Sequence, residues 1–360
     1  MCHNYHISMS ALVCTKREIY FKNGGIGLEK FKQNPIVKKI GFNRVILIGV
    51  LILMYLAFGL FCSLMGRATF FNISRVYSAL NYTYFLGFLA LGVTFVIGTG
   101  GIDFSMGPVM FCSALISGYT LTKMNVPVVL ALLISILVGT LFGLFNGYLV
   151  AYWKMPSFIT SMASMMLAKG IGSVFTKTQS VSWPSSMEAN GWYRKLVRIP
   201  LGDGLYIPTG LIILALAAII CAIVLNNTKA GRYILCLGSN KEAVRLSGVD
   251  VKIWETLAYV LCGMMAGIAA IFYVGAYTTV QPGLGDAFNN EAIASCVMGG
   301  TSMAGGVASI GGTFIGVLII SVLQEGILAM GFQKDYQYVI TGIIVLVAVY
   351  ADIKSRKRRN

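Results

Sequence analysis

Long apolar runs dominate the chain from about residue 45 onward, and short polar stretches separate them. A helix needs about 20 predominantly apolar residues to cross a bilayer. The pattern predicts ten such spans, at 45–65, 81–98, 107–123, 128–150, 157–175, 208–226, 255–276, 289–304, 313–330 and 338–351. The eighth is short and polar for a lipid-facing helix, which favours a broken or re-entrant helix inside the bundle. We therefore expect an all-α polytopic membrane protein with about ten transmembrane helices.

Composition supports this fold class. The 360 residues are 57% hydrophobic and only 11% charged, whereas a soluble domain averages about 25% charged residues. These values exclude a disordered chain and an ordinary soluble enzyme. The eight cysteines form no C-x-x-C pair and fall mostly within apolar runs, which indicates small buried side chains rather than a metal site or a disulfide framework.

The placement of charge sets the expected topology. The net charge is +15, and basic residues cluster before residue 45 and after residue 353. Such clusters beside apolar spans are typical of cytoplasmic tails near anionic lipid and argue against nucleic-acid binding. With both termini inside, 19 Lys and Arg lie inside and eight outside, which favours N-in and C-in. We expect basic cytoplasmic tails at 1–44 and 352–360, and a transmembrane domain over 45–351.

Two loops are long. Loop 176–207 faces outward on this topology, and its Trp183, Trp192 and Tyr193 are interpreted first as an interfacial aromatic belt and second as a docking lip. Loop 227–254 faces the cytoplasm.

The cytoplasmic loop contains a short helix candidate. Asn240 is a favourable N-cap, and Gly248 is typical of the residue just past a helix end. The body runs from Lys241 to Leu246. Its two faces carry Ala243 with Leu246, and Glu242 with Arg245. Because so short a helix is not stable alone, it should pack against this protein's own cytoplasmic face or against a separate subunit.

The 41 glycines are often spaced four residues apart. This spacing places glycines on one helix face and lets helices approach closely in lipid. We predict helix packing at Gly139, Gly143, Gly147, Gly263 and Gly267.

Two glycine-rich segments interrupt the apolar pattern, namely G-T-G-G-I-D-F-S-M-G at 98–107 and G-G-T-S-M-A-G-G-V-A-S-I-G-G at 299–312. Unwound backbone at membrane depth is tolerated only inside protein or beside a cavity. Asp103 needs a partner there, because an intramembrane charge is costly. Two interpretations stand equally: a pore lining or hinge, and a helix corner with Asp103 as N-cap of the next span.

Catalytic signatures are missing from the sequence. It contains no G-x-x-x-x-G-K-[ST], no G-x-S-x-G and no H-E-x-x-H. We therefore expect a non-catalytic transport protein without a cofactor, powered by a gradient or by another subunit.

Three ordered stretches resemble the membrane permeases of bacterial ribose-type ABC sugar importers. They are T-K-A-G-R-Y-I-L-C-L-G-S-N-K-E-A-V-R-L-S-G-V-D-V at 228–251, Q-P-G-L-G-D-A-F-N-N-E-A-I-A-S-C-V-M-G-G-T-S-M-A-G-G at 281–306, and G-G-I-D-F-S-M-G at 100–107. The resemblance covers about 80–352. Glu291 departs from it, because the family usually has an apolar residue there.

The resemblance implies an importer subunit in the bacterial inner membrane that forms the path for a ribose-like monosaccharide or related polyol. Its implied partners are a cytoplasmic tandem-cassette ATPase, an extracellular sugar-binding protein and a second permease, identical or paralogous. ATPase coupling would fall on Asn240, Glu242, Arg245, Leu246 and Gly248. Candidate path or hinge residues are Asp103, Ser105, Glu291, Thr301 and Ser302.

One alternative stays open from the residues alone. A stand-alone secondary transporter of a small polar solute would use a proton gradient through Asp103, Glu291 or Glu325. Both kinds of transporter have broken, glycine-rich helices, so the need for an ATPase or for a protonmotive force is what separates them.

Overall fold

The structure, a computed structural model, describes residues 42–67, 70–202, 204–333 and 335–357. The predicted tail 1–44 therefore lies almost wholly outside the described residues. The chain divides into two units, 1–49 and 50–360. The described part of the first unit is the beginning of helix α3 (Phe42–Leu64).

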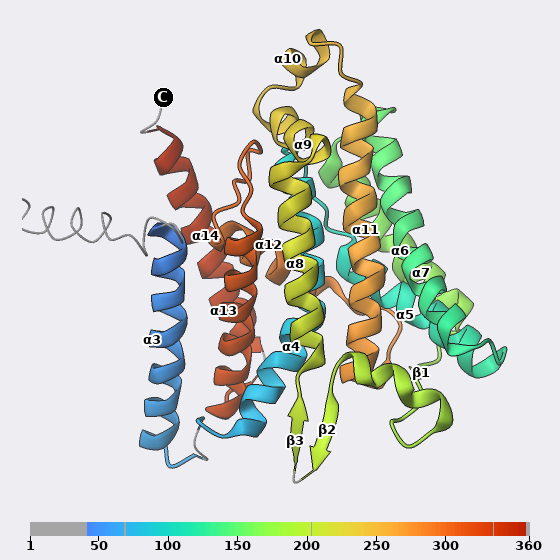
Figure 1. Cartoon of the computed structure of the whole chain (residues 1–360), viewed down its shortest axis with the longest axis vertical. Helices are drawn as coiled ribbons and strands as arrows, with labels where there is room; N and C mark the ends of the chain where they lie inside the picture. The colour runs from blue at the N-terminus through green and yellow to red at the C-terminus, as the bar shows by residue number, and fades with distance from the viewer. Residues whose placement is uncertain (1–41, 68–69, 203, 334, 358–360) are drawn as a thin grey trace, which may run out of the picture. The chain divides into compact units, whose positions relative to one another are not determined.

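The second unit is a bundle of helices (Figure 1). In chain order after α3 they are α4 (Ile73–Gly98), α5 (Met106–Lys123), α6 (Val128–Ala151), α7 (Ser157–Phe175), α8 (Thr209–Asn227), α9 (Lys229–Ser239), α10 (Lys241–Leu246), α11 (Val251–Ala276), α12 (Asp286–Met298), α13 (Ile310–Ala329) and α14 (Asp335–Lys357). Each predicted span falls on one of these helices or on α3. The last helix continues to Lys357, into the segment predicted as a tail.

Seven of the described helices are long and apolar enough to cross a membrane: α3, α4, α6, α7, α8, α11 and α13. This confirms a polytopic helical membrane protein. Helices α5, α12 and α14 are not among the seven, so the count of ten stays a prediction. Helix α12 has 13 residues, which span about 20 Å at 1.5 Å per residue against a hydrocarbon core of about 30 Å.

Helix α4 occupies the centre of the bundle. In the most apolar stretch of α4, 89% of the residues are buried inside the protein, whereas in that of α8 the share is 22%. Because α4 is surrounded by protein, its sequence is apolar on all sides without a lipid-facing stripe. Helices α11 and α13 pack directly against it.

Helices α6 and α11 meet through glycines. A methyl group on Gly143 would lie 2.4 Å from the carbonyl oxygen of Tyr259, and one on Gly263 would lie 2.2 Å from that of Gly139. Only glycine lets the two backbones come this close. The same interface includes Gly147, which faces Thr256, and Gly267, which faces Ser135.

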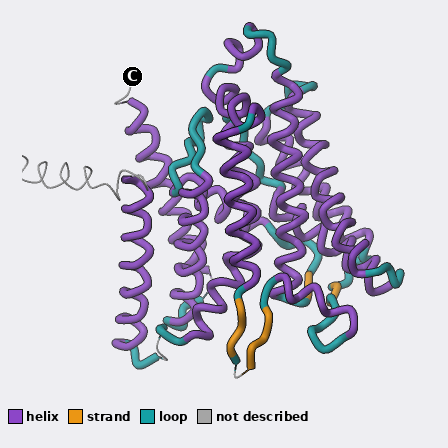
Figure 2. The backbone as a smooth tube through the Cα atoms, viewed as in Figure 1, coloured by secondary structure: helices purple, strands orange, loops and turns teal. Residues whose placement is uncertain are grey.

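The strands and the arm formed by α9 and α10 lie at opposite ends of the bundle (Figures 1 and 2). Strand β1 (Val181–Ser182) pairs with β4 (Thr279–Val280), and β2 (Ile199–Gly202) pairs with β3 (Leu205–Ile207). The 3-10 helix η1 (Ala189–Leu196) lies between β1 and β2 in the chain. These pieces fold loop 176–207 and part of the α11–α12 connection into ordered structure.

The interfacial-belt interpretation of loop 176–207 is wrong for two of its three aromatics. Trp183 and Tyr193 are buried and pack ring against ring. The Trp183 indole N–H donates to the carbonyl of Ala114, 3.1 Å away, and the Tyr193 hydroxyl donates to the carbonyl of Pro184. Buried Trp and Tyr usually find such partners. Trp192 alone of the three is exposed.

Candidate functional site: the α9–α10 arm and the broken helices

The arm comprises residues 228–250. Helix α8 ends at Asn227, and Thr228 caps α9 by accepting the Gly231 N–H. A methyl group on Gly231 would lie 2.0 Å from the carbonyl oxygen of Leu225. The tight turn from α8 into α9 therefore requires glycine at this position.

Helix α10 has the predicted bounds. The Asn240 side-chain oxygen accepts the Ala243 N–H at 3.0 Å, as expected of an N-cap. The helix ends at Leu246 with Ser247 as its C-cap, and Gly248 has a φ of +81°, the left-handed conformation that favours glycine. Sequence reasoning predicted this element correctly because its stop and start signals are local.

Val244 attaches α10 to the rest of the protein. It is buried against Leu237 of α9 and Val251 of α11. The Lys241 ammonium adds an ion pair with Glu255 at 2.6 Å. Leu246, in contrast, is 74% exposed. The face bearing Ala243 and Leu246 thus does not pack on the described part of this chain.

The charged face of α10 carries an ion pair of its own. The Arg245 guanidinium lies 2.5 Å from the Glu242 carboxylate, and both side chains are well exposed. Hydrogen bonds from Arg245 hold the pKa of the Glu242 carboxyl below its ordinary value. The pair therefore stays ionised at neutral pH, and it is lost only as the pH falls through that lowered pKa.

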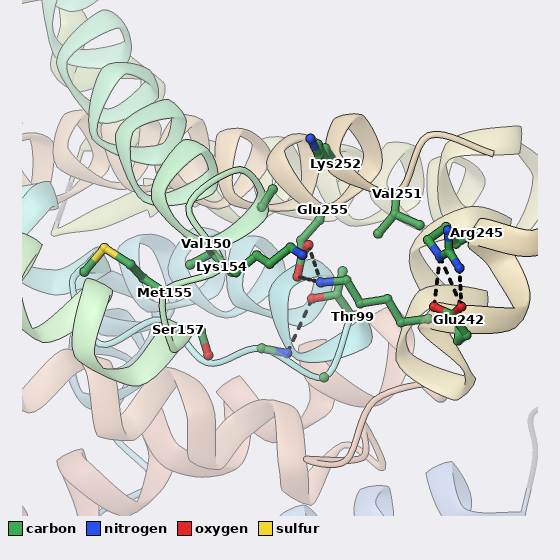
Figure 3. A pocket seen from close by; sticks show the side chains of 14 residues that line it. Thr99, Val150, Lys154, Met155, Ser157, Glu242, Arg245, Val251, Lys252 and Glu255 are labelled. Carbon is green, nitrogen blue, oxygen red and sulfur yellow. Dashed lines mark hydrogen bonds and ion pairs between the residues drawn. The ribbon is translucent and has the colours of Figure 1, made fainter. Parts of the chain in front are cut away.

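A cleft of about 790 Å³ opens beside α10 (Figure 3). Its walls come from α10, the start of α11, the end of α6 and the turn after α4. Glu242 and Arg245 line it, and Lys154, Lys252 and Glu255 face it from the other walls. A polar cleft of mixed charge at one end of a membrane-spanning bundle is suited to a protein partner rather than to lipid tails.

The three family-like segments meet beneath the arm, where a methyl group on Gly305 would lie 2.7 Å from the Gly100 nitrogen and 2.8 Å from the Gly238 Cα. Glycines at 98, 238 and 306 bring α4, α9 and the loop after α12 into direct backbone contact. A methyl group on Gly238 would lie 2.1 Å from the Gly98 oxygen and 2.3 Å from the Gly306 nitrogen. The Gly306 N–H also donates to the Gly98 carbonyl at 3.0 Å. Gly238 of α9 therefore contacts both the end of α4 and the loop after α12.

The end of α4 leads into the break before α5, and the loop after α12 forms the second break. The side chain of Asn289, on α12, bridges the break before α5. Its oxygen accepts the Gly107 N–H at 2.7 Å, and its amide nitrogen donates to the Phe104 carbonyl at 2.5 Å. A buried helix start leaves unpaired N–H groups, and Asn289 satisfies one of them from a different helix.

Asp103 belongs to a buried network. Its carboxylate accepts the Ser105 N–H at 2.8 Å and the Ser105 hydroxyl at 2.6 Å. The Asn146 amide donates to the same hydroxyl, and the Ser164 hydroxyl donates to Asn146. The network thus ties the segment before α5 to α6 and α7. The N-cap interpretation of Asp103 is wrong, because the N-cap of α5 is Ser105.

Thr301 and Ser302 hold the loop after α12. The Thr301 hydroxyl oxygen accepts the Ser309 N–H at 3.2 Å, and the Ser302 N–H donates to the Val307 carbonyl at 2.9 Å. Both residues are buried. Their place in the loop that contacts Gly98 and Gly238 is consistent with a hinge.

Glu291 lies in a different cluster from Asp103. Its carboxylate accepts hydrogen bonds from the Tyr82 hydroxyl and from the Gln337 amide. It occupies the second turn of α12 rather than the first, so it does not cap that helix. Glu325 of α13 pairs with Arg75 at 2.8 Å.

Sequence reasoning did not single out Asn289 or Asn146 as site residues, although both are buried and hydrogen-bonded across helices. The available signal was an amide inside an apolar run. An amide there needs a partner, but the sequence does not say which helix supplies it.

Comparisons with known proteins agree with the motifs. A family described as branched-chain amino acid transport system / permease component matches residues 75–349. The ribose import permease protein RbsC of Escherichia coli K12 is 32% identical to this chain, and the aligned region covers 80% of this chain and 88% of RbsC. The protein of the same name from Bacillus subtilis is 35% identical, with 74% of this chain and 81% of the relative aligned. The xylose transport system permease protein XylH of Escherichia coli K12 is 28% identical, with 86% of this chain and 92% of XylH aligned. No solved structure matches.

Proposed function

Because the chain belongs to this permease family, as a ribose-type ABC sugar importer permease of the bacterial inner membrane, we propose that it forms the path for a ribose-like monosaccharide or a related small polyol. A separate cytoplasmic ATPase would drive it through the α9–α10 arm. The chain itself is a non-catalytic multi-pass subunit.

The observation that carries the proposal is the exposed surface of α10. The helix is fixed to its own chain by Val244, while Leu246 and the Glu242–Arg245 pair are left exposed. An apolar side chain beside a charged pair on a rigid projection is the pattern of a docking element. The predicted coupling residues fall on this projection, with Asn240 and Gly248 at its two ends.

The backbone contacts under the arm supply the route for coupling. Movement of the ATPase would move α10 and then α9. Because Gly238 touches Gly98 and Gly306 directly, the movement reaches the breaks before α5 and after α12. Asp103, Ser105, Thr301 and Ser302 hold these breaks and would act as hinge residues. Rocking of such broken helices around a fixed path is how alternating access works in many transporters.

The opposite end of the bundle is the proposed contact for the extracellular sugar-binding protein. It presents the β2–β3 hairpin and η1, whose exposed apolar side chains include Leu201, Leu205 and Trp192. The complete importer would contain a second permease, identical or paralogous, so that the sugar passes between two bundles.

The names of the relatives guide the substrate class. Two are ribose permeases and one is a xylose permease. A pentose is accordingly the first solute to test, with other monosaccharides and polyols after it.

The proton-coupled alternative receives less support. Asp103 lies in one cluster with Ser105 and Asn146, while Glu291 is held by Tyr82 and Gln337 in another. A proton relay needs titratable groups in sequence, whereas these carboxylates belong to separate networks.

The proposal is tested by co-purification of the tagged chain with its co-expressed ATPase. The variant is the charge swap Glu242→Arg/Arg245→Glu, which keeps an oppositely charged pair on α10 but reverses its direction. We expect the wild type to retain the ATPase and the swap to lose it.

The matched control is Lys229→Glu, which changes a charge on α9 outside α10 and outside the cleft. Retention of the ATPase by the control but not by the swap places docking on α10. Equal retention by all three chains, or none by the wild type, contradicts the proposal.

A further inference from the structure

An ion pair joins α7 to the start of α12 at membrane depth. The Lys169 ammonium lies 2.5 Å from the Asp286 carboxylate. Helix α7 has 19 residues, so it is about as long as the hydrocarbon core is thick. Lys169 comes six residues before the end of this helix at Phe175, which is about 9 Å along the axis. The pair therefore lies within the hydrocarbon depth rather than at the headgroups.

The pair is exposed on the surface of the bundle. The Lys169 and Asp286 side chains are 26% and 54% exposed. A charge that faces hydrocarbon is costly. A lysine can stretch its long side chain towards the headgroups, but the short side chain of Asp286 cannot, and it holds the Lys169 ammonium beside it. Lipid tails are thus a poor cover for this part of the surface.

The exposed side of α12 is polar. The helix is buried from Glu291 to Val297, and its exposed residues are Asp286 and Asn290. These two are four residues apart and so share one helix face. Helix α8 shows the opposite pattern, because the exposed side chains along its apolar run are all hydrophobic: Ile212, Leu216, Ile219, Ile220 and Ile223. The bundle thus has a surface suited to lipid on α8 and one suited to water on α12.

The polar surface lies where two helices begin inside the bundle. A methyl group on Gly107, at the start of α5, would lie 2.2 Å from the carbonyl oxygen of Gly285, at the start of α12. Asn289 points inward and accepts the Gly107 N–H, whereas its neighbour Asn290 is exposed. Helices that begin at membrane depth are found beside the solute sites of many transporters.

We propose that Lys169, Asp286 and Asn290 line the water-filled path along which the solute crosses the membrane. A dry contact with a second permease is disfavoured here, because it would strip water from the ion pair at a cost that the attraction often fails to repay. The pair balances its own charge, so this wall of the path is polar without a net charge. The proposal rests on the proposed transport function and identifies the side of the bundle that faces the path.

Reaction of an introduced cysteine with a water-soluble reagent tests the proposal. Asn290→Cys is made in a chain whose Cys2, Cys14 and Cys236 are serine, since the other native cysteines are buried. The matched control is Ile219→Cys, which is 56% exposed in the middle of α8. Each chain is held in nanodiscs with the ATPase and treated with a charged methanethiosulfonate. Because the thiolate is the reactive form and needs water, we expect Asn290→Cys to react about tenfold faster than the control, or more.

Breaking the ion pair shows whether its charges face the same water. Lys169→Gln leaves Asp286 alone beside Asn290→Cys. One unit charge about 7 Å away in water changes the local concentration of a singly charged reagent about threefold. A cationic reagent should then react about threefold faster and an anionic one about threefold slower. Asp286→Asn should reverse this preference.

A second position and a transport measurement keep the outcome decisive. Should Asn290→Cys fail to fold, Asp286→Cys combined with Lys169→Gln repeats the labelling. In proteoliposomes that hold the complete importer, labelling of Asn290→Cys should abolish D-ribose uptake, whereas treated Ile219→Cys should keep it.

Three results overturn the proposal: equal labelling of Asn290→Cys and Ile219→Cys, a reaction rate that ignores the charge changes at Lys169 and Asp286, and labelling that leaves uptake intact. None of these affects the docking of α10, which is judged by co-purification. A lack of uptake by the untreated chain is a different result, because it contradicts the proposed function and the path with it.

Discussion

At the residue scale, two buried amides hold the break before α5. Asn289 spans the break before α5, and Asn146 links Ser105 to Ser164. Composition and spacing indicated where the breaks are, since both segments are rich in glycine. They did not indicate which amides close the break before α5, because the partners are far apart in the chain, as the separation of Gly107 and Asn289 shows.

Asn289→Leu should destabilise the protein. The substitution keeps the approximate volume but leaves the Gly107 N–H and the Phe104 carbonyl without their partner. We expect a loss of about 1–3 kcal/mol for these buried groups, read as a lowered apparent Tm in detergent. Ser295→Ala, on the same helix, is the control, because among the described residues the Ser295 hydroxyl bonds back to the Glu291 carbonyl of its own helix and to no other. A Tm equal to that of the control contradicts the bridging role.

At the element scale, apolar length and local signals predicted the helices well. All ten expected spans fall on helices, and α10 has the predicted bounds. Loop 176–207 was predicted poorly, because its strand β1 depends on pairing with Thr279 and Val280, about a hundred residues away. The burial of Trp183 is likewise a tertiary effect that an aromatic in a loop does not reveal.

Close packing of α6 on α11 makes Gly143 sensitive to substitution. Gly143→Ala would place a methyl group 2.4 Å from the Tyr259 carbonyl oxygen, and overpacking of this kind costs about 1–3 kcal/mol. Gly170→Ala is the control, because nothing lies within 4 Å of its added methyl group. Thermal unfolding should show a lower Tm for the first variant and an unchanged or slightly higher Tm for the second. Equal Tm values would show that the glycine interface tolerates side chains.

Contact of α9 with the loops makes Gly238 a coupling position. Gly238→Ala should push α9 away from Gly98 and Gly306, so transport falls severalfold while the exposed face of α10 still binds the ATPase. Sugar uptake and co-purification are measured on the same preparation. Cys236→Ala, exposed on the same helix, should leave both unchanged. Normal uptake by Gly238→Ala would show that coupling does not pass through this contact.

At the scale of the whole molecule, the two ends of the bundle have different chemistry. One end carries the arm and a large cleft of mixed charge, and the other carries the strands and a small polar cavity. The family was evident from the sequence, because the three motif segments keep their order. That these segments meet at Gly100, Gly238 and Gly305 follows only from the fold.

The central claim is that this permease is driven by an ATPase rather than by a proton gradient. The most direct measurement is uptake of labelled D-ribose into proteoliposomes holding the chain, its ATPase and its sugar-binding protein, with ATP and a protonophore varied independently. We predict uptake that requires ATP and the ATPase and continues in the presence of the protonophore. Uptake that proceeds without the ATPase and collapses on adding the protonophore would contradict the account and turn attention to Asp103, Glu291 and Glu325.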